Sequence, residues 1–170
     1  PNQMKKLIVI WISMLSTSLF SQTTIESVLN NYNDESVPYI KVEALKNNTD
    51  KLLILDAREK EEYEVSHLKN AHHIGFKNFN LLALEQLTEN SLTDLDMQII
   101  VYCSIGVRSE IIGKKLMSHG YTNVYNLYGG VFEWVNKGGD VYQKGEPTKK
   151  VHAYSKKWGP YLIKGVKVYE

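Results

Sequence analysis

The stretch QIIVYCSIGVRS, residues 98–109, decides the fold class. Its first six residues, 98–103, form a short and mainly apolar run, which is typical of a strand buried on both faces of a sheet. The segment 109–119 then carries apolar residues at helical spacing, and Gly120 follows it as a glycine often follows a helix. Parallel α/β sheets are built from such strand–loop–helix units, so the stretch predicts an α/β fold.

Similar units lie on both sides of this stretch. Short apolar runs predict further strands over 52–56, 71–74 and 124–127. Helical spacing and capping residues predict further helices over 24–31, 59–65, 80–89 and 131–136. Because strands alternate with helices of about two to three turns, the chain is expected to form a central, mainly parallel sheet flanked by helices.

Length and composition set the class of protein. With 170 residues, the chain has the length of one domain with additions. Hydrophobic residues make up 43% and charged residues 23%, which suits a globular fold, and a mean hydropathy of −0.30 excludes a polytopic membrane protein. A net charge of +1 excludes binding to nucleic acid driven by bulk charge. The single cysteine excludes an internal disulfide framework and a zinc site of cysteines alone.

The histidines do not predict a metal site. His67, His72 and His73 lie close together in the sequence, but no carboxylate or thiol falls at an established zinc spacing from them. His119 ends a predicted helix, where its side chain is expected to interact with the last carbonyl groups. We therefore expect no metal site.

The first 21 residues have the pattern of a secretory signal. Lys5 and Lys6 precede the apolar run 7–12, and small polar residues follow it. The run is shorter than the ~18 residues of a membrane-spanning helix, so we expect cleavage after Ser21, a periplasmic or secreted protein, and no stable membrane anchor. An uncleaved anchor or an ordinary N-terminal strand is the alternative. Residues 22–37 would then be a helical segment and linker.

Residues 140–170 differ from the rest of the chain, because aromatic residues alternate with lysines there. We expect an aromatic-rich C-terminal extension that is hairpin-like and packs on the domain. Short strands are predicted over 151–154 and over either 161–163 or 166–169. Basic residues between aromatic ones also occur in nucleic-acid-binding proteins. The near-neutral charge and the expected export argue against that function.

Cys103 carries the predicted chemistry. It ends the predicted strand 98–103, where ligands of open α/β sheets bind, and the residues after it lead directly into a helix. The N–H groups of such a loop and the positive end of the helix dipole bind anions and favour a thiolate. Gly106 permits a left-handed backbone, and Arg108 adds a positive charge for an anionic substrate. The alternative is a buried, inert cysteine.

We therefore expect Cys103 to be the catalytic nucleophile, with no separate histidine base. The substrate-binding residues are expected in the loop that follows it: Ser104, Ile105, Gly106, Val107, Arg108 and Ser109. Asp56 ends another predicted strand, and Asp56 and Arg58 are expected to support the site. Arg58 and Glu62 are four residues apart, a spacing that predicts an ion pair on a helix.

Three motifs resemble those of the rhodanese sulfurtransferases. The first is the loop CSIGVRS, residues 103–109, after a buried strand. The second is DAR at 56–58, followed at similar spacing by EY at 62–63, HL at 67–68 and Ala71. The third is LYGG at 127–130, followed by Trp134. The resemblance implies a rhodanese-like, three-layer domain over 38–139, which the extension 140–170 follows.

The same resemblance implies sulfur transfer. Cys103 and Arg108 have four residues between them, which is similar to the sulfurtransferase loop, whereas related phosphatases and arsenate reductases have five. The implied activity moves sulfane sulfur from a small anionic donor such as thiosulfate to a thiol or protein cysteine, through a Cys103 persulfide and without a cofactor. The alternatives are a non-catalytic binding or sulfur-carrier module and, in another class, an oxyanion-handling enzyme.

The sequence departs from the family pattern at several positions. Ser66 and Asn70 stand where the family usually has glycine, and asparagine tolerates left-handed backbone better than most residues. Ile105 stands where several thiosulfate-using members have a basic residue, so Arg108 is expected to be the only cation of the loop. This difference argues against thiosulfate as the physiological donor without affecting the persulfide chemistry.

Overall fold

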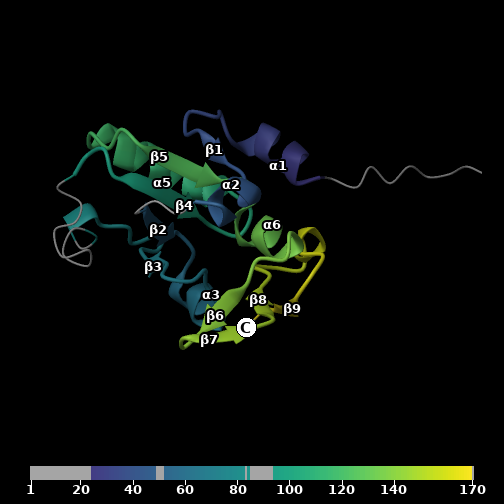
Figure 1. Cartoon of the computed structure of the whole chain (residues 1–170). Coiled ribbons are helices and arrows are strands. Elements are labelled where there is room, and N and C mark those ends of the chain that lie inside the picture. Colours follow the sequence, from purple (N-terminus) through teal and green to yellow (C-terminus); the bar gives the residue numbers. More distant parts are fainter. Residues whose placement is uncertain (1–23, 49–51, 83, 85–93, 170) are drawn as a thin grey trace, which may run out of the picture.

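The computed structural model describes residues 24–48, 52–82, 84 and 94–169, and a five-stranded parallel sheet organises them (Figure 1). Its strands are β1 (Tyr39–Ile40), β2 (Leu52–Asp56), β3 (His72–His73), β4 (Gln98–Tyr102) and β5 (Val124–Leu127). They lie in the order β1-β5-β4-β2-β3, and every pair is parallel. The predicted α/β class is therefore confirmed, and the strand before Cys103 is the central one.

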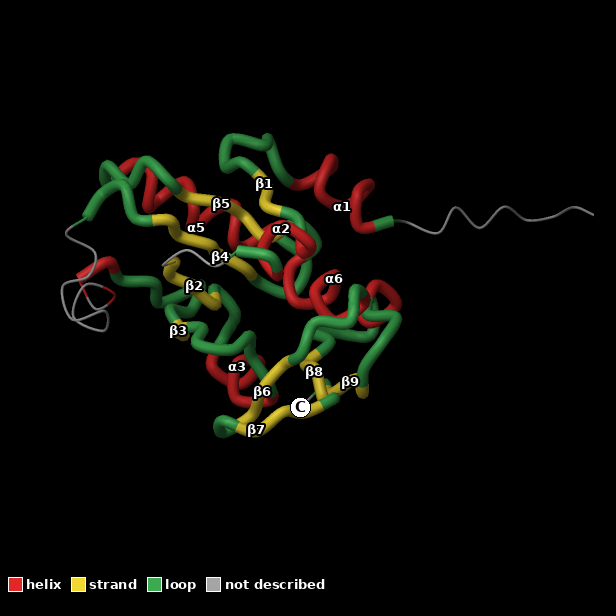
Figure 2. The backbone as a smooth tube through the Cα atoms, in the orientation of Figure 1, coloured by secondary structure: helices red, strands yellow, loops and turns green. Residues whose placement is uncertain are grey.

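Helices cover both faces of the sheet and make three layers (Figure 2). The apolar side chains of β4 alternate between the two faces, as strand geometry requires. Ile99 and Val101 pack in one core cluster with residues of α5 (Val107–Ser118). Ile100 and Tyr102 pack in the other, with residues of α2 (Val42–Lys46) and α6 (Gly130–Asn136). Both faces of β4 are thus buried, which explains its continuous apolar run.

Local sequence explains where two helices of the N-terminal half, α1 and α3, begin. Thr24 caps α1 (Ile25–Tyr32), and its side chain accepts a hydrogen bond from the Ser27 N–H at 3.1 Å. Glu59 caps α3 (Lys60–Val65), and the Glu62 carboxylate accepts a hydrogen bond from the Glu59 N–H at 3.0 Å. This capping box fixes the first turn of α3, from which Glu62 reaches the region of Cys103.

The helix after Cys103 begins earlier than the apolar spacing predicts. Gly106 has a φ of 111°, and α5 starts at the next residue, Val107, rather than at Ser109. Because the left-handed turn at Gly106 ends the loop, Val107 and Arg108 belong to the first helical turn. The expected helix over 80–89 and the expected signal over 1–21 lie largely or wholly outside the described residues.

The C-terminal extension forms two small sheets. β6 (Val141–Gln143) and β7 (Glu146–Thr148) make an antiparallel hairpin, whereas β8 (Lys150–His152) and β9 (Val166–Val168) pair in parallel. The expected strand over 161–163 is wrong, because a 3₁₀ helix (Gly159–Tyr161) leads into that segment, and the alternative over 166–169 is the strand that forms. The hairpin-like arrangement therefore holds only for β6 and β7.

The extension packs on the domain rather than standing apart from it. Val151, Ala153 and Leu162 are fully buried in the same core cluster as Phe132 of α6. His67 and Tyr142 exchange two backbone hydrogen bonds of 2.9 and 2.8 Å, which attach β6 to the segment after α3. In Figure 1 the yellow C-terminal segment lies beside α6.

No helix among the described residues has the length and apolar character needed to cross a membrane.

Ser66 and Asn70, at the two positions where the family usually has glycine, are accommodated in different ways. Asn70 has a φ of 59°, so the left-handed backbone is kept and asparagine adopts it. Ser66 has a φ of −174°, which is extended backbone open to any residue. Neither substitution therefore disturbs the path of the chain between α3 and β3.

Candidate active site

The thiol of Cys103 lies at the carboxyl end of the central strand and is 1% exposed. The backbone N–H of Gly106 donates a hydrogen bond to Sγ at 3.1 Å. The Ser109 hydroxyl, in the first turn of α5, lies 3.6 Å from the same sulfur. The sulfur therefore sits at the N-terminus of a 12-residue helix, where the helix dipole and the loop N–H groups stabilise an anion.

These contacts lower the pKa of the Cys103 thiol. Burial acts in the opposite direction and is the largest single influence, because a thiolate loses hydration in the interior. The positive charge of Arg108 and the hydrogen bonds from Ser109 and Gly106 together outweigh it. The pKa of Cys103 therefore lies below the ordinary value of a cysteine, as a nucleophilic thiolate requires.

A buried amide and a buried carboxylate hold the loop in this conformation. Asn126 of β5 donates hydrogen bonds to the Gly106 carbonyl at 2.8 Å and to the Glu110 carboxylate at 3.1 Å. It also accepts a hydrogen bond from the Ser109 hydroxyl at 2.7 Å. With its carbonyl fixed on Asn126, Gly106 keeps its N–H directed at the sulfur. Sequence reasoning missed this positioning role of Asn126, because a polar residue in a buried strand has no partner visible in the sequence.

The first residues of α6 also donate hydrogen bonds to this loop. The N–H groups of Val131 and Phe132 donate hydrogen bonds to the carbonyls of Cys103 and Ser104 at 2.9 and 3.1 Å. Gly130 has a φ of 57°, and a Cβ there would meet the Cys103 carbonyl oxygen and lie 2.7 Å from the Ser104 carbonyl carbon. The second glycine of LYGG thus permits the close backbone approach that fixes the loop.

Gly130→Ala is expected to lower the free energy of unfolding by about 2–4 kcal/mol, because it adds a clash with backbone to the strain of a left-handed residue. Gly138→Ala is the matched control, since Gly138 has a φ of 74° and open space around its Cβ position. That control should lose only about 1 kcal/mol. Chemical denaturation measures both values, and equal losses would contradict the argument from close approach.

Arg108 is paired with a carboxylate rather than free. Its guanidinium donates hydrogen bonds to both oxygens of Glu62, at 2.7 and 2.8 Å, and to the Ser104 hydroxyl at 3.0 Å. The Ser104 hydroxyl donates in turn to Glu62 at 3.0 Å. Burial acts to raise the pKa of Glu62, but the contact with Arg108 holds it below its usual value. Glu62 was not expected at the site, although its spacing from DAR was noted.

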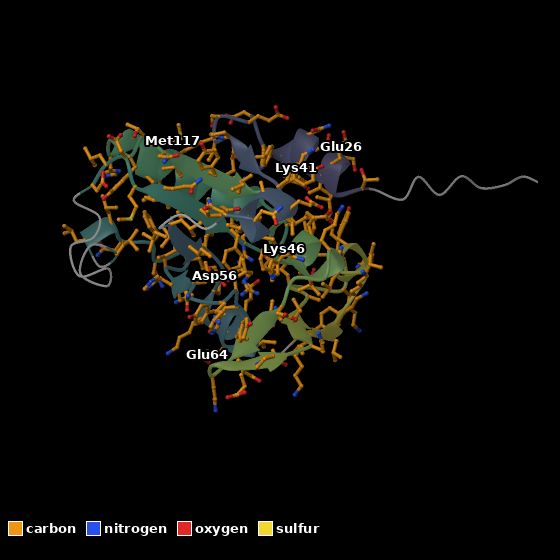
Figure 3. All side chains as sticks on the ribbon, in the orientation of Figure 1. Glu26, Lys41, Lys46, Asp56, Glu64 and Met117 are labelled. Atoms are coloured by element: carbon orange, nitrogen blue, oxygen red, sulfur yellow. The ribbon has the colours of Figure 1, made fainter. Side chains whose placement is uncertain are left out.

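The predicted ion pair between Arg58 and Glu62 is wrong. Arg58 precedes α3, which begins at Lys60, so the helical i,i+4 spacing does not apply to it. Its guanidinium turns back to Asp56, with Nε 2.9 Å from Oδ1 and a terminal nitrogen 2.5 Å from Oδ2. Asp56 is fully buried, and in Figure 3 it lies toward the middle of the view, whereas Glu64, also labelled, lies near the lower edge.

The Asp56–Arg58 pair belongs to a fully buried hydrogen-bond network at the strand ends next to Cys103. Both side chains are 0% exposed. The Tyr102 hydroxyl donates to Asp56 at 2.5 Å, and Arg58 donates to the Ser66 carbonyl at 2.6 Å. Burial and the nearby Asp56 carboxylate raise the pKa of Tyr102 well above its ordinary value. The supporting role expected of Asp56 and Arg58 stays a prediction, and the hydrogen bonds described for the two side chains do not reach the Cys103 sulfur.

A pocket of about 150 Å³ opens above Cys103. Of the predicted loop residues, Ser104, Ile105, Val107 and Arg108 line it, whereas Gly106 and Ser109 contact the sulfur from the helix side. Sequence reasoning missed the other lining residues, which come from α1, α6 and the extension: Tyr32, Phe132, Tyr154 and Trp158. Only the aromatic composition of 140–170 hinted at them.

Comparison with known proteins identifies the class to which this fold and site belong. The family model described as the rhodanese-like domain matches residues 41–137. Since this match spans more than half of the sequence, the chain belongs to the rhodanese-like domain family. The match excludes α1 and the whole C-terminal extension.

Similar curated proteins differ in activity. The chain is 32% identical over 118 residues to the tRNA uridine(34) hydroxylase of Photorhabdus laumondii, covering 66% of this chain and 32% of that protein. It is 35% identical to the candidate sulfur carrier protein YrkF of Bacillus subtilis, covering 62% and 55%. It is 30% identical to the thiosulfate sulfurtransferase GlpE of Coxiella burnetii, covering 49% and 71%. The chain thus spans about a third of the first protein and about half of the second.

Solved structures agree on the fold. The thiosulfate sulfurtransferase of Pseudomonas aeruginosa superposes with a TM-score of 0.56 at 22% identity, over 72% of this chain and 22% of that one. The rhodanese-like domain of the Anabaena protein Alr3790 superposes with a TM-score of 0.53 at 24% identity, over 62% and 79%. The predicted rhodanese-like architecture is therefore confirmed.

Proposed function

We propose that this protein is a sulfurtransferase that carries sulfane sulfur as a Cys103 persulfide. The observation that carries the proposal is the environment of the Cys103 thiol. Its sulfur accepts a hydrogen bond from the Gly106 N–H at 3.1 Å, and its pKa is lowered despite its burial. The loop with four residues between Cys103 and Arg108 and the relationship to a thiosulfate sulfurtransferase support the same reading. An activated thiolate in a small pocket suits attack on sulfur.

The reaction has two half-reactions. The Cys103 thiolate forms a bond to the outer sulfur of the donor, and the S–S bond of the donor breaks so that its remaining part leaves with the electron pair. With thiosulfate the leaving group is sulfite. The Gly106 N–H and the N-terminus of α5 stabilise the persulfide anion. A thiolate or cyanide then attacks the outer sulfur, and the Cys103 thiolate leaves.

The test is the intact mass of the protein before and after a sulfane-sulfur donor, and again after cyanide. The expected result is a gain of one sulfur atom that cyanide removes and that Cys103→Ser abolishes. Because serine has nearly the shape of cysteine, the variant should stay folded, which circular dichroism checks. Absence of any gain with thiosulfate and with organic persulfide donors would overturn the proposal.

A sulfur-carrier role is the second candidate, and the relationship to the candidate carrier YrkF is the observation that favours it. A carrier holds the persulfide until a partner protein takes it, whereas an enzyme turns over with small thiols. Multiple turnovers with cyanide or a small thiol support the enzyme. A stable persulfide that small acceptors do not discharge supports the carrier.

A further inference from the structure

We propose that the sulfur donor of this protein is an organic sulfane-sulfur compound with an aryl or similarly sized apolar group and at most one negative charge. Tyr32, Tyr154 and Trp158, which we call the aromatic collar, would select that group. This inference rests on the proposed function and names the donor class of the same site.

The aromatic collar comes from segments outside the family match. Tyr32 ends α1, and Tyr154 and Trp158 belong to the extension, while the match covers only 41–137. The Tyr32 and Trp158 rings pack at a centroid distance of 6.1 Å and a tilt of 59°. Segments that lie outside the family match therefore converge on the mouth of the pocket that the matched domain builds.

Specific contacts hold Tyr154 of the aromatic collar at the pocket. Tyr154 has a φ of 64°, an unfavourable backbone for a tyrosine, and its N–H donates to the His152 ring at 3.1 Å. Its ring lies against the Arg108 guanidinium, whose central carbon is 4.9 Å from the ring centroid. Tyr32 and Tyr154 are nevertheless 59% and 49% exposed. Exposed rings around a pocket provide apolar area that a bound ligand would cover.

The size and lining of the pocket fit an apolar group. Ile105, Val107 and Phe132 line it below the aromatic collar. Its volume of about 150 Å³ is similar to that of an apolar cavity known to hold one benzene molecule. A sulfur atom alone would fill a small part of this volume. The remaining space is therefore suited to the organic group that leaves with the rest of the donor.

The charge of the pocket disfavours a dianion. Arg108 is the one charged side chain among the described residues that line it, and its charge is paired with Glu62 at 2.7 Å. A thiosulfate dianion entering the pocket would lose hydration without meeting a net positive charge. A donor with one negative charge or none needs less compensation.

Two thiosulfonates test this proposal, because they carry the same single charge and differ only in their organic group. With benzenethiosulfonate or methanethiosulfonate, the Cys103 thiolate takes the outer sulfur, the S–S bond breaks, and the sulfinate leaves with the electron pair. The rate of persulfide formation is measured by intact mass for both compounds and for thiosulfate. Each rate is divided by the rate of the same donor with free cysteine, which removes intrinsic reactivity.

The expected result is a corrected rate constant of persulfide formation for benzenethiosulfonate at least about tenfold above that for methanethiosulfonate, with thiosulfate lowest of the three. In Tyr32→Ala the ratio of the two thiosulfonates should fall about threefold or more. Tyr32 is exposed enough for this change to leave the fold intact. Ile163→Ala is the control, since Ile163 is 79% exposed in the extension that carries Tyr154 and Trp158 and does not line the pocket. Its ratio should equal that of the wild type.

The outcomes separate this inference from the proposed function. A ratio near one, a ratio unchanged in Tyr32→Ala, or thiosulfate matching benzenethiosulfonate would overturn the donor class while sulfur transfer at Cys103 stands. Absence of persulfide with all three compounds would overturn the proposed function itself. A ratio that falls equally in Ile163→Ala would assign the effect to the general stability of the extension, and it would also overturn the role of the aromatic collar.

Discussion

Replacing Arg58 by methionine is expected to lower the free energy of unfolding by about 3–5 kcal/mol. The guanidinium is fully buried, and it holds the fully buried carboxylate of Asp56 through hydrogen bonds of 2.9, 3.1 and 2.5 Å. Without it, a carboxylate would be left in the interior with only two donors among the described residues, the Tyr102 hydroxyl and the backbone N–H of residue 58. Thermal denaturation should show a midpoint lower by roughly 10 °C or more.

Two further variants make the prediction specific to burial. Lys60→Met breaks the ion pair of Lys60 with Glu64, whose side chains are 73% and 63% exposed, and it should change stability by less than about 0.5 kcal/mol. The double variant Asp56→Leu/Arg58→Met leaves no charge unpaired and should be more stable than Arg58→Met alone. If Arg58→Met were no more damaging than Lys60→Met, the buried network would not stabilise the fold.

The elements that the sequence predicts well are those with a local signal. The strand expected over 98–103, which forms over Gln98–Tyr102, the loop after it and the helix that follows were expected from apolar runs and one glycine. The start of α1 follows from Thr24 because a capping hydrogen bond spans only three residues. The two-residue error at the start of α5 has a local cause too, since apolar spacing does not record the left-handed turn at Gly106.

Side-chain pairing could not be predicted in the same way. The sequence spacing suggested Arg58 with Glu62, whereas Arg58 pairs with Asp56 and Glu62 pairs with Arg108 from a different helix. The choice depends on where α3 begins and on how it lies beside α5, which are properties of the packed domain. Charges four residues apart indicate a pair only when both lie on one helix.

The aromatic collar was the feature furthest from prediction. Tyr32 and Trp158 are separated by most of the chain, yet their rings pack together at the mouth of the pocket. An isolated tyrosine at the end of a short helix carries no signal of its own, and the extension was expected only to pack on the domain. Such convergence of distant segments becomes visible only when the path of the chain is known.

Arg108→Ala is expected to reduce the reactivity of Cys103 at neutral pH by roughly tenfold or more. The thiolate is the reactive form, so reactivity rises with pH through the pKa of Cys103 and levels off above it. Burial acts to raise that pKa, and the charge of Arg108 is the strongest influence that lowers it. Removing a positive charge disfavours the anion, so the pKa rises and the rising limb of the profile moves to higher pH.

Alkylation by iodoacetamide across a pH series measures this shift. At high pH, where both proteins hold a thiolate, the rates of Arg108→Ala and wild type should converge, whereas a misfolded site would differ at every pH. Arg108→Lys keeps the charge but loses the two-pronged contact with Glu62, so its limb should lie nearer to that of the wild type. Because Arg108→Ala leaves the Glu62 side chain, 4% exposed, without its partner, Arg108→Ala/Glu62→Gln serves as the version without an unpaired charge. That double variant removes a cation and an anion. The rising limb of its pH profile should therefore fall between those of Arg108→Ala and Arg108→Lys. Identical limbs in all four proteins would mean that the helix N-terminus and the loop N–H groups alone ionise the cysteine, and that the Arg108–Glu62 pair serves only to hold α3 against α5.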